Sequence, residues 1–398
     1  MTTSIIGYPR IGAQRELKFA TEKFFKKELS EADLQAVAAT QRQANWQKQA
    51  AAGIDFIASN DFSFYDTTLD TAFALNIVPK RYQELAVSPL ERYFAAARGH
   101  QSEAGDVKAL AMKKWFNTNY HYMVPEFDDG TEIKLDLTKL LSEYREALAL
   151  GITTKPVLIG PFTLLKLIRF TGQTQLSDVQ EDFVKAYSEI LSVLATEEVA
   201  WLQLDEPGLV FDLTESDIHL FKAIYTALLP QKQTVKVLLQ TYFGDVRDVY
   251  SDLIQLDFDG IGLDFVEGRK TAELIQTHGF PADKKLFAGV VNGKNIWRND
   301  YQKTLEILQT LPKDSLIIST SCSLQHVPYT VSAEPELPQD ILRHFAFAEE
   351  KLLELKDLNE IFYHGQVDSL TANQALFASE RYQGNQAVQA KVAALGEA

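Results

Sequence analysis

Residues 201–206 read Trp-Leu-Gln-Leu-Asp-Glu, a short and mostly apolar run that ends in two carboxylates. Such a run is typical of a strand that is buried on both faces of a parallel sheet. Seven other runs of this kind occur along the chain, with amphipathic helices predicted between them. The predicted strands cover 4–7, 54–59, 157–162, 201–206, 235–241, 260–265, 285–291 and 315–322, and the helices after the last six cover 178–198, 215–229, 246–256, 270–278, 299–311 and 338–355.

Eight strand–helix units in one chain predict an α/β fold, a (β/α)8 barrel of the TIM type. An open, doubly wound sheet is the alternative, but no Gly-x-Gly-x-x-Gly follows a strand and no Walker-type loop is present. Residues 61–152 interrupt the alternation, and we interpret them as a long insertion after the second strand. We assign residues 1–355 to the barrel domain and residues 356–398 to a helical tail or linker.

The composition narrows the possible partners. Of 398 residues, 46% are hydrophobic and 23% charged, as in soluble globular proteins. The net charge of −15 argues against nucleic acid as a partner, because phosphate binding needs a basic surface. The first residues do not resemble a signal peptide, and no apolar run reaches the roughly 18 residues of a membrane span. We therefore expect a cytoplasmic protein without a membrane partner.

Metal ligation by this chain is not expected. Cys322 is the one cysteine, which rules out an internal disulfide and a cysteine-rich zinc site. The seven histidines are dispersed, without a His-x-His or His-x-x-x-His pair. We therefore assign no metal ligand.

Polar residues follow the predicted strands where a barrel has its active face. Asp205 and Glu206 form a carboxylate pair that could act in acid–base chemistry, or could instead cap helices or pair with arginines. Neither a nucleophile–base pair nor a metal triad accompanies them, so we assign no catalytic residue. The residues alone leave open a ligand-binding barrel or an enzyme of unknown reaction.

An aromatic stretch lies within the predicted insertion. Residues 113–127 read Lys-Lys-Trp-Phe-Asn-Thr-Asn-Tyr-His-Tyr-Met-Val-Pro-Glu-Phe. We interpret them as an ordered loop that holds Lys114, Asn117, Asn119 and His121 against a ligand, with the aromatic rings packed beneath. The alternative is a loop that is held only by the packing of its aromatic side chains, with its lysines in solvent.

Two cations begin the first predicted helix. Arg15 and Lys18 lie three residues apart and so share a face in its first turn. A helix N-terminus favours anions rather than cations, which suggests that an anion is supplied from elsewhere. The alternative is an ordinary solvated basic face.

Several of these segments resemble the amino-terminal half of cobalamin-independent methionine synthase, over nearly the whole chain and in order. The run from Lys114 to Phe127 is the longest and most specific of them. The others are Gly7-Tyr8-Pro9-Arg10-Ile11-Gly12, Arg15-Glu16-Leu17-Lys18, Leu204-Asp205-Glu206-Pro207, Val291-Asn292-Gly293 and Ser321-Cys322-Ser323-Leu324.

The resemblance implies a pair of fused barrels that transfers the methyl group of 5-methyltetrahydropteroyl-polyglutamate to homocysteine, forming methionine. It implies zinc as the cofactor, which activates the homocysteine thiolate, and no cobalamin. The zinc ligands and the homocysteine site would belong to a carboxy-terminal barrel that this chain lacks. The helical tail would lead toward that barrel. The fragment alone is then expected to be inactive.

The resemblance also implies a folate-binding role for this half. It carries over to Arg15, Glu16, Leu17, Lys18 and Lys114 as residues that bind the folate polyglutamate. Polyglutamate is a run of carboxylates, and the three cations among these residues are what an acidic protein would need locally to bind it.

This sequence departs from the pattern of the other, carboxy-terminal barrel at one place. The resemblance implies a His-x-Cys pair in that barrel, whereas the corresponding residues here are Gln240-Thr241-Tyr242. The alternatives are a stand-alone barrel that binds anionic metabolites and a barrel lyase that uses Asp205 and Glu206.

Overall fold

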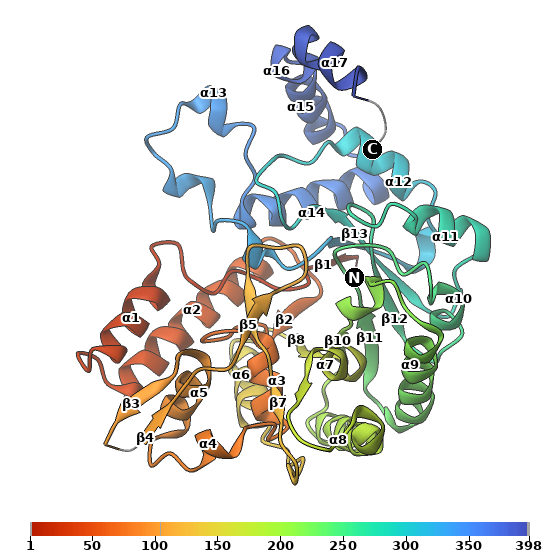
Figure 1. Ribbon diagram of the computed structural model, residues 1–398. Helices are drawn as coiled ribbons and strands as arrows, with labels where there is room; N and C mark the ends of the chain where they lie inside the picture. Colours follow the sequence, from red (N-terminus) through yellow and green to blue (C-terminus); the bar gives the residue numbers. More distant parts are fainter. Residues whose placement is uncertain (1, 104, 396–398) are drawn as a thin grey trace.

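The computed structural model describes residues 2–103 and 105–395 and contains the predicted barrel (Figure 1). Its eight parallel strands follow the order β1-β14-β13-β12-β11-β10-β8-β2. A parallel bridge between Ser4 and Phe56 joins the two ends of this sheet and closes it. The strands are β1 (Thr3–Ser4), β2 (Ile57–Ser59), β8 (Thr154–Ile159), β10 (Trp201–Asp205), β11 (Lys236–Gln240), β12 (Gly260–Asp264), β13 (Lys285–Val291) and β14 (Leu316–Thr320).

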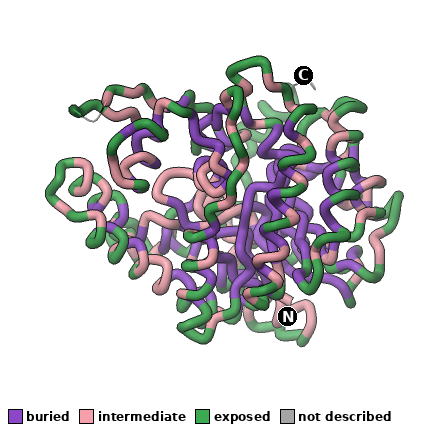
Figure 2. The backbone as a smooth tube through the Cα atoms, turned by 90° about the horizontal axis from the view of Figure 1, so that it is seen from below, coloured by how far each residue is buried: buried purple, intermediate pink, exposed green. Residues whose placement is uncertain are grey.

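Both faces of the strands are buried, as their apolar sequences require (Figure 2). Leu238 and Phe287 point inward and pack with Phe56 and Ile317 in a small cluster inside the barrel. Their neighbours along the strands belong to the large core beneath the surrounding helices. These helices are α7 (Pro161–Leu167), α8 (Leu176–Thr196), α9 (Glu215–Leu228), α10 (Tyr250–Leu253), α11 (Thr271–His278), α12 (Tyr301–Leu308) and α14 (Ala348–His364).

Two predicted elements were placed wrongly. The third strand runs three residues earlier than predicted, because Pro161 occupies the first turn of α7 and the strand must end before it. The helix predicted at 338–355 is broken into α13 (Gln339–Leu342) and α14. Between them, the amide of Arg298 donates to the carbonyl of His344 (2.9 Å) and Phe345 bridges to Trp297, so this backbone pairs with a loop instead of continuing a helix.

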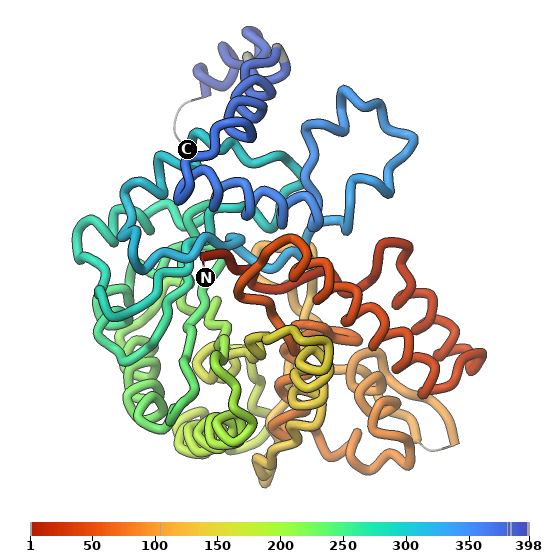
Figure 3. Tube along the Cα trace, turned by 180° about the vertical axis from the view of Figure 1, so that it is seen from behind, coloured from red at the N-terminus to blue at the C-terminus, as the bar shows by residue number. Residues whose placement is uncertain are grey.

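The segment after β2 and the first two helices form a second layer beside the barrel (Figures 1 and 3). Helices α1 (Glu16–Phe25) and α2 (Glu31–Ala51) share a separate core with α3 (Thr67–Ala74) and α5 (Pro89–Arg98). Helix α6 (Thr138–Ala149) returns to the barrel and packs against β2 and β8. The remaining elements are α4 (Lys80–Gln83), β3 (His100–Ser102), β4 (Gly105–Val107), β5 (Met112–Lys114), β6 (His121–Met123) and β7 (Glu126–Phe127), which pairs with β9 (Arg169–Phe170).

The end of the chain is helical, with α15 (Asp368–Phe377), α16 (Glu380–Gln383) and α17 (Gln386–Ala393). Asn373 joins α15 to the barrel, because its side chain accepts from the amide of Tyr301 (3.0 Å) and donates to the carbonyl of Asn299 (2.9 Å). Helix α14 runs through the predicted domain boundary at residue 355, and the division into two domains stays a prediction. Among the described residues, no helix has the length and apolar character needed to cross a membrane.

Candidate functional site

The loop after β1 carries the first candidate residues. Gly12 has a φ of +86° and Arg15 a φ of 63°, so the chain turns sharply into α1. Arg10 anchors this loop to the insertion, because its guanidinium donates to the carbonyls of Phe64 (3.4 Å) and Tyr65 (2.8 Å). The loop is therefore anchored to the insertion, and it leaves the N-terminus of α1 without a side-chain cap.

Residues 15–18 point in different directions. Leu17 is buried in the core between α1 and the insertion, so only its backbone is available to a ligand. The carboxylate of Glu16 turns back and accepts from the amide of Gln14 (3.0 Å). Arg15 and Lys18 are exposed, and the Lys18 amine forms a solvent-exposed pair with Glu22 (3.8 Å) and lies over the Phe19 ring (5.8 Å). Of the four, Arg15 and Lys18 are the side chains that can meet an anion.

Arg15 lines a cavity of about 740 Å³ between α1 and the end of β14. The cavity also contains the side chains of Arg10, Tyr120 and Glu334, so two cations face one carboxylate. His326 lies on its wall, and neither of its ring nitrogens has a hydrogen-bond partner in the described chain. Burial lowers the pKa of His326 to about 4, which keeps the ring neutral. His326 was not predicted as a site residue, and its position shortly after β14 is the one signal that could have identified it.

Residues 112–123 form an antiparallel hairpin of β5 and β6, in which Lys114 pairs with His121. Trp115 closes the turn, because its amide donates to the carbonyl of Tyr120 (2.8 Å) and its own carbonyl accepts from the amide of Thr118 (3.1 Å). Phe116 has a φ of 50°, a conformation that is strained for a large side chain. Surrounding contacts must hold it there.

Those contacts place the hairpin across the carboxy-terminal mouth of the barrel. The Phe116 ring stacks on Phe211 (4.9 Å between centroids) and lies against Phe243 (5.7 Å), which follow β10 and β11. The Tyr120 hydroxyl donates to the carbonyl of Gln325 (2.8 Å), after β14. The aromatic stretch thus joins loops from opposite sides of the barrel.

Asn117 at the hairpin tip completes this attachment. Its amide donates to Glu267 (2.6 Å), and its oxygen accepts from Lys294 (2.9 Å), while Glu267 and Lys294 pair with each other (2.6 Å). Asn117 was predicted to face a ligand, and it instead holds the loops after β12 and β13. His121 and Lys114 remain exposed, as does Asn119.

Lys114 lines a second cavity, of about 480 Å³, with Phe116, Phe211 and Phe243. Lys113 is the other cation there, and none of the described residues that line this cavity is a carboxylate. Arg15 and Lys114 therefore do not share a cavity. The hairpin borders both cavities, since Tyr120 lines the first and Lys114 the second.

Glu206 has a structural role. Its carboxylate accepts from the amides of Phe162 (3.0 Å) and Thr163 (2.6 Å) at the start of α7, and from the hydroxyl of Tyr225. A Cβ on Gly160 would lie 2.2 Å from this carboxylate, so a glycine is needed there. Burial raises the pKa of Glu206 to about 7, against the effect of these donors. Glu206 thus caps a helix, one of the three roles that the sequence left open.

Asp205 belongs to a hydrogen-bonded chain inside the barrel. It accepts from Gln203 (2.7 Å) and from the hydroxyl of Tyr242 (3.0 Å), and Gln203 in turn accepts from Lys155. Burial raises the pKa of Asp205 to about 7 and lowers that of Lys155 to about 8. All four side chains are buried, and none lines a cavity described above. This hydrogen-bonded chain therefore lies outside both cavities.

Asp205→Asn is expected to reduce the loss of stability with rising pH. Folding raises the pKa of Asp205, so the folded state binds its proton more tightly, and stability falls as pH rises from the ordinary pKa toward 7. Between pH 5.5 and 8 this group alone should cost the native protein about 2 kcal/mol. Urea unfolding at both pH values measures the difference. Asp182→Asn, on the exposed face of α8, should keep the native pH dependence.

Within residues 2–103 and 105–395, no three histidine, cysteine, aspartate or glutamate side chains are grouped so that they could hold a metal ion. Cys322 is buried, and burial raises the pKa of its thiol. The described residues therefore do not fit the zinc that the resemblance implies, and no step through zinc can be assigned to them.

Comparison with known proteins agrees with this geometry. Residues 2–315 match the family model described as "Cobalamin-independent synthase, N-terminal domain". The 5-methyltetrahydropteroyltriglutamate–homocysteine methyltransferase of Lactococcus lactis subsp. cremoris SK11 is 53% identical over 393 residues, 98% of this chain and 52% of the relative. The enzyme of that name from Streptococcus pneumoniae D39 is 52% identical over 398 residues, the whole chain and 53% of the relative. The chain thus spans about half the length of these relatives.

Solved structures agree on the fold. A putative vitamin-B12 independent methionine synthase from Listeria monocytogenes superposes with a TM-score of 0.63 at 15% identity, over 91% of this chain and 98% of that one. The B12-independent methionine synthase from Shewanella sp. W3-18-1 gives a TM-score of 0.58 over 85% and 91%. At such identities the likeness shows the fold alone, whereas the family model and the relatives cover most of the sequence. The chain belongs to the family of cobalamin-independent methionine synthases and corresponds to its N-terminal domain.

Proposed function

We propose that this chain is the folate-binding half of a methyltransferase that transfers the methyl group of 5-methyltetrahydropteroyl-polyglutamate to homocysteine. The observation that carries the proposal is the 52–53% identity, over 98–100% of the chain, to about half of each of two 5-methyltetrahydropteroyltriglutamate–homocysteine methyltransferases. In the proposed division, zinc and homocysteine bind in a second half, and this chain alone does not transfer the methyl group. A cytoplasmic location stays a prediction.

The exposed cations support a role in binding the glutamate tail. Arg15, Lys18 and Lys114 have no buried or short ion pair among the described residues, so their charges are available to a ligand. Each side chain can form a charge-assisted hydrogen bond with a carboxylate. The uncapped N-terminus of α1 adds backbone amides and a favourable dipole. In a protein of net charge −15, local cations of this kind are needed to hold a polyanion.

The direct test is a calorimetric titration of the chain with 5-methyltetrahydropteroyltriglutamate and with the monoglutamate. We expect the triglutamate to bind at least about tenfold more tightly, since it offers further carboxylates to the cations. The difference should shrink as salt is raised from 0.05 to about 0.5 M, where exposed charges are screened. Equal affinity for both forms would contradict tail binding, and no binding of either would contradict the proposal.

A further inference from the structure

A pocket on the side of the barrel, away from both cavities described above, contains a buried group of charges. It has a volume of about 370 Å³ and lies between α2, α3, α5 and α6. We define it by Phe64, Asp70, Phe73, Tyr93, Lys139 and Glu143, and call it the side pocket. Arg15, Lys18 and Lys114 do not line it, so it is separate from the residues proposed to bind folate.

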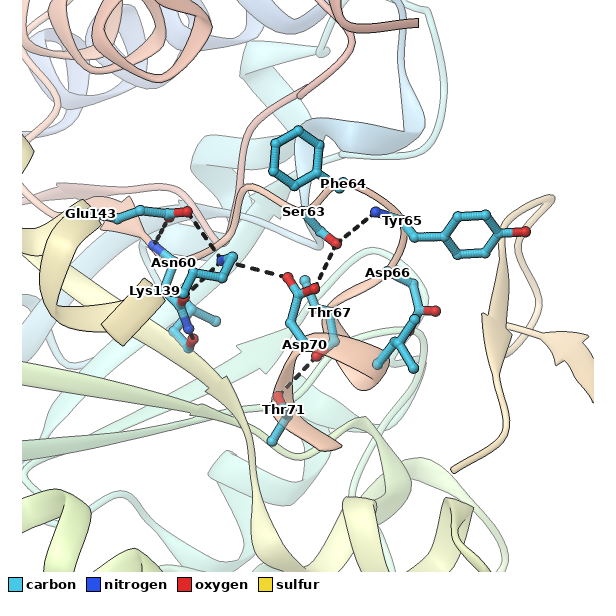
Figure 4. Close-up of polar contacts among 12 residues, drawn as sticks. Asn60, Ser63, Phe64, Tyr65, Asp66, Thr67, Asp70, Thr71, Lys139 and Glu143 are labelled. Atoms are coloured by element: carbon cyan, nitrogen blue, oxygen red, sulfur yellow. Dashed lines mark hydrogen bonds and ion pairs between the residues drawn. The ribbon is translucent and has the colours of Figure 1, made fainter. Parts of the chain in front are cut away.

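The charges at the base of the side pocket do not balance. Figure 4 shows Lys139 pointing toward Asn60, Asp70 and Glu143. Its amine donates to Asn60 (2.8 Å) and pairs with Glu143 (3.2 Å) and Asp70 (3.5 Å). One cation thus serves two carboxylates. Arg42, the other cation on the wall, is already bonded to Glu146 at 2.7 Å.

Glu143 has a partner for each of its two carboxylate oxygens. One oxygen accepts from the amide of Asn60 (3.1 Å) and the other faces the amine of Lys139, so both meet donors. Burial raises the pKa of Glu143, and the charge of Lys139 acts in the opposite direction. Lys139 lies nearer to Glu143 (3.2 Å) than to Asp70 (3.5 Å), so Asp70 is the carboxylate with the weaker pairing.

Asp70 is the carboxylate that lacks a full set of partners. Its side chain is only 7% exposed. One oxygen accepts from the hydroxyls of Tyr93 (2.6 Å) and Ser63 (3.1 Å), as Figure 4 shows for Ser63. The other oxygen, Oδ2, has no hydrogen-bond partner in the described chain, and its only cation is the shared Lys139. A buried carboxylate oxygen without a donor is costly, and a donor from a ligand would satisfy it.

The walls of the side pocket suit an apolar body. The rings of Phe64 and Phe73 are half-buried, and Leu90, Leu140 and Leu158 complete the apolar surface. Aromatic faces also attract cations. Two further carboxylates, Glu31 and Asp136, stand at the rim, so an anionic ligand would be repelled.

We propose that the side pocket binds a small primary amine with an aromatic or apolar body, whose ammonium group pairs with Asp70 while the body lies against Phe64 and Phe73. To reach Oδ2, the ammonium takes the place of the Lys139 amine beside Asp70, and Lys139, whose side chain is 35% exposed, keeps its pair with Glu143. The volume, near the lower end for small-molecule sites, suits one ring with a short chain.

Ligand-observed NMR and calorimetry with phenethylamine as the probe, and with 2-phenylethanol as its neutral match, test the proposal on the whole chain. We expect phenethylamine to bind at least about tenfold more tightly than the alcohol, as one charged hydrogen bond predicts. Asp70→Asn should remove this preference while its remaining oxygen still accepts from Tyr93. Equal binding of amine and alcohol, or an unchanged preference in Asp70→Asn, would overturn the proposal.

Two further variants make the result independent of folding defects. Asp136→Asn, at the rim, keeps an acceptor for the amide of Thr138, because asparagine caps helices as well as aspartate does. This variant should change amine binding by less than about twofold. Ser142→Trp lies at an exposed position of α6 and should block the side pocket. If phenethylamine still binds to Ser142→Trp with native affinity, it binds elsewhere and the proposal fails. Triglutamate binding should be unchanged in all three variants.

Discussion

Replacing Arg15 and Lys114 together by alanine is expected to weaken the binding of 5-methyltetrahydropteroyltriglutamate by about a hundredfold or more. A hydrogen bond between charged groups is worth roughly 1.5–3 kcal/mol, which is about tenfold to a hundredfold for each residue. The two side chains line different cavities on either side of the hairpin, so they would hold different carboxylates, and their losses should add.

The matched control is the double variant Lys23→Ala with Lys185→Ala, which removes two other exposed cations. Its net charge equals that of the test variant. It should bind the triglutamate within about twofold of the native chain. The monoglutamate should lose less than the triglutamate in the test variant, because it offers fewer carboxylates. An equal loss for both ligands would show that the two residues do not contact the tail.

The same substitutions have a kinetic signature in a protein of the relatives' full length. A contact made equally to the ground state and the transition state affects KM and leaves kcat nearly unchanged. Lys114→Ala alone should then raise KM for the triglutamate by about tenfold to a hundredfold. A collapse of kcat at unchanged KM would give Lys114 a different role.

Glu206→Ala is expected to destabilise the chain by about 3–5 kcal/mol at pH 8, without any effect on ligand contacts. The substitution leaves the amides of Phe162 and Thr163 and the hydroxyl of Tyr225 buried without an acceptor. Each unsatisfied buried donor costs about 1–3 kcal/mol, and the removal of a buried charge offsets part of the sum.

Urea unfolding followed by circular dichroism measures this loss. Glu206→Gln keeps one accepting oxygen and should lose less, while Glu189→Ala, on the exposed face of α8, should stay within about 0.5 kcal/mol of the native value. Native stability in Glu206→Ala would mean that the cap on α7 is unimportant, and would reopen a chemical role for this carboxylate.

The barrel itself could be predicted because its signal is local and repeated. Each apolar run that ends in polar residues forms a strand, and the order of the sheet follows from the handedness rule for parallel connections. The third strand was misplaced although Gly160-Pro161 carried the information, since proline is favoured in the first turn of a helix. The break near Phe345 was not predictable, because a loop far along the chain competes for its backbone.

The candidate site could be predicted only in part. The motif gave Arg15 and Lys18, which are exposed, but also Leu17, whose side chain the fold buries. The aromatic hairpin was identified as an ordered loop from its composition. The contacts of this hairpin with Phe211 and Gln325 could not be predicted. Those two residues follow other strands, and no local pattern connects them with residue 116.

The hairpin of β5 and β6 can dock on the barrel only after the later residues that it contacts have been synthesised. Trp115 and Phe116 emerge from the ribosome roughly 200 residues before Gln325 and His326, to which the hairpin attaches. At 5–20 residues per second, that interval is on the order of 10–40 s. During this interval, β1 lacks its pairing partner β14, which is the last strand of the barrel. The aromatic rings of the hairpin also lack the complete barrel that they cover in the folded chain. Nascent chains of this family should therefore depend on chaperones until the eighth strand is made, and truncation before residue 316 should yield aggregates rather than a smaller barrel.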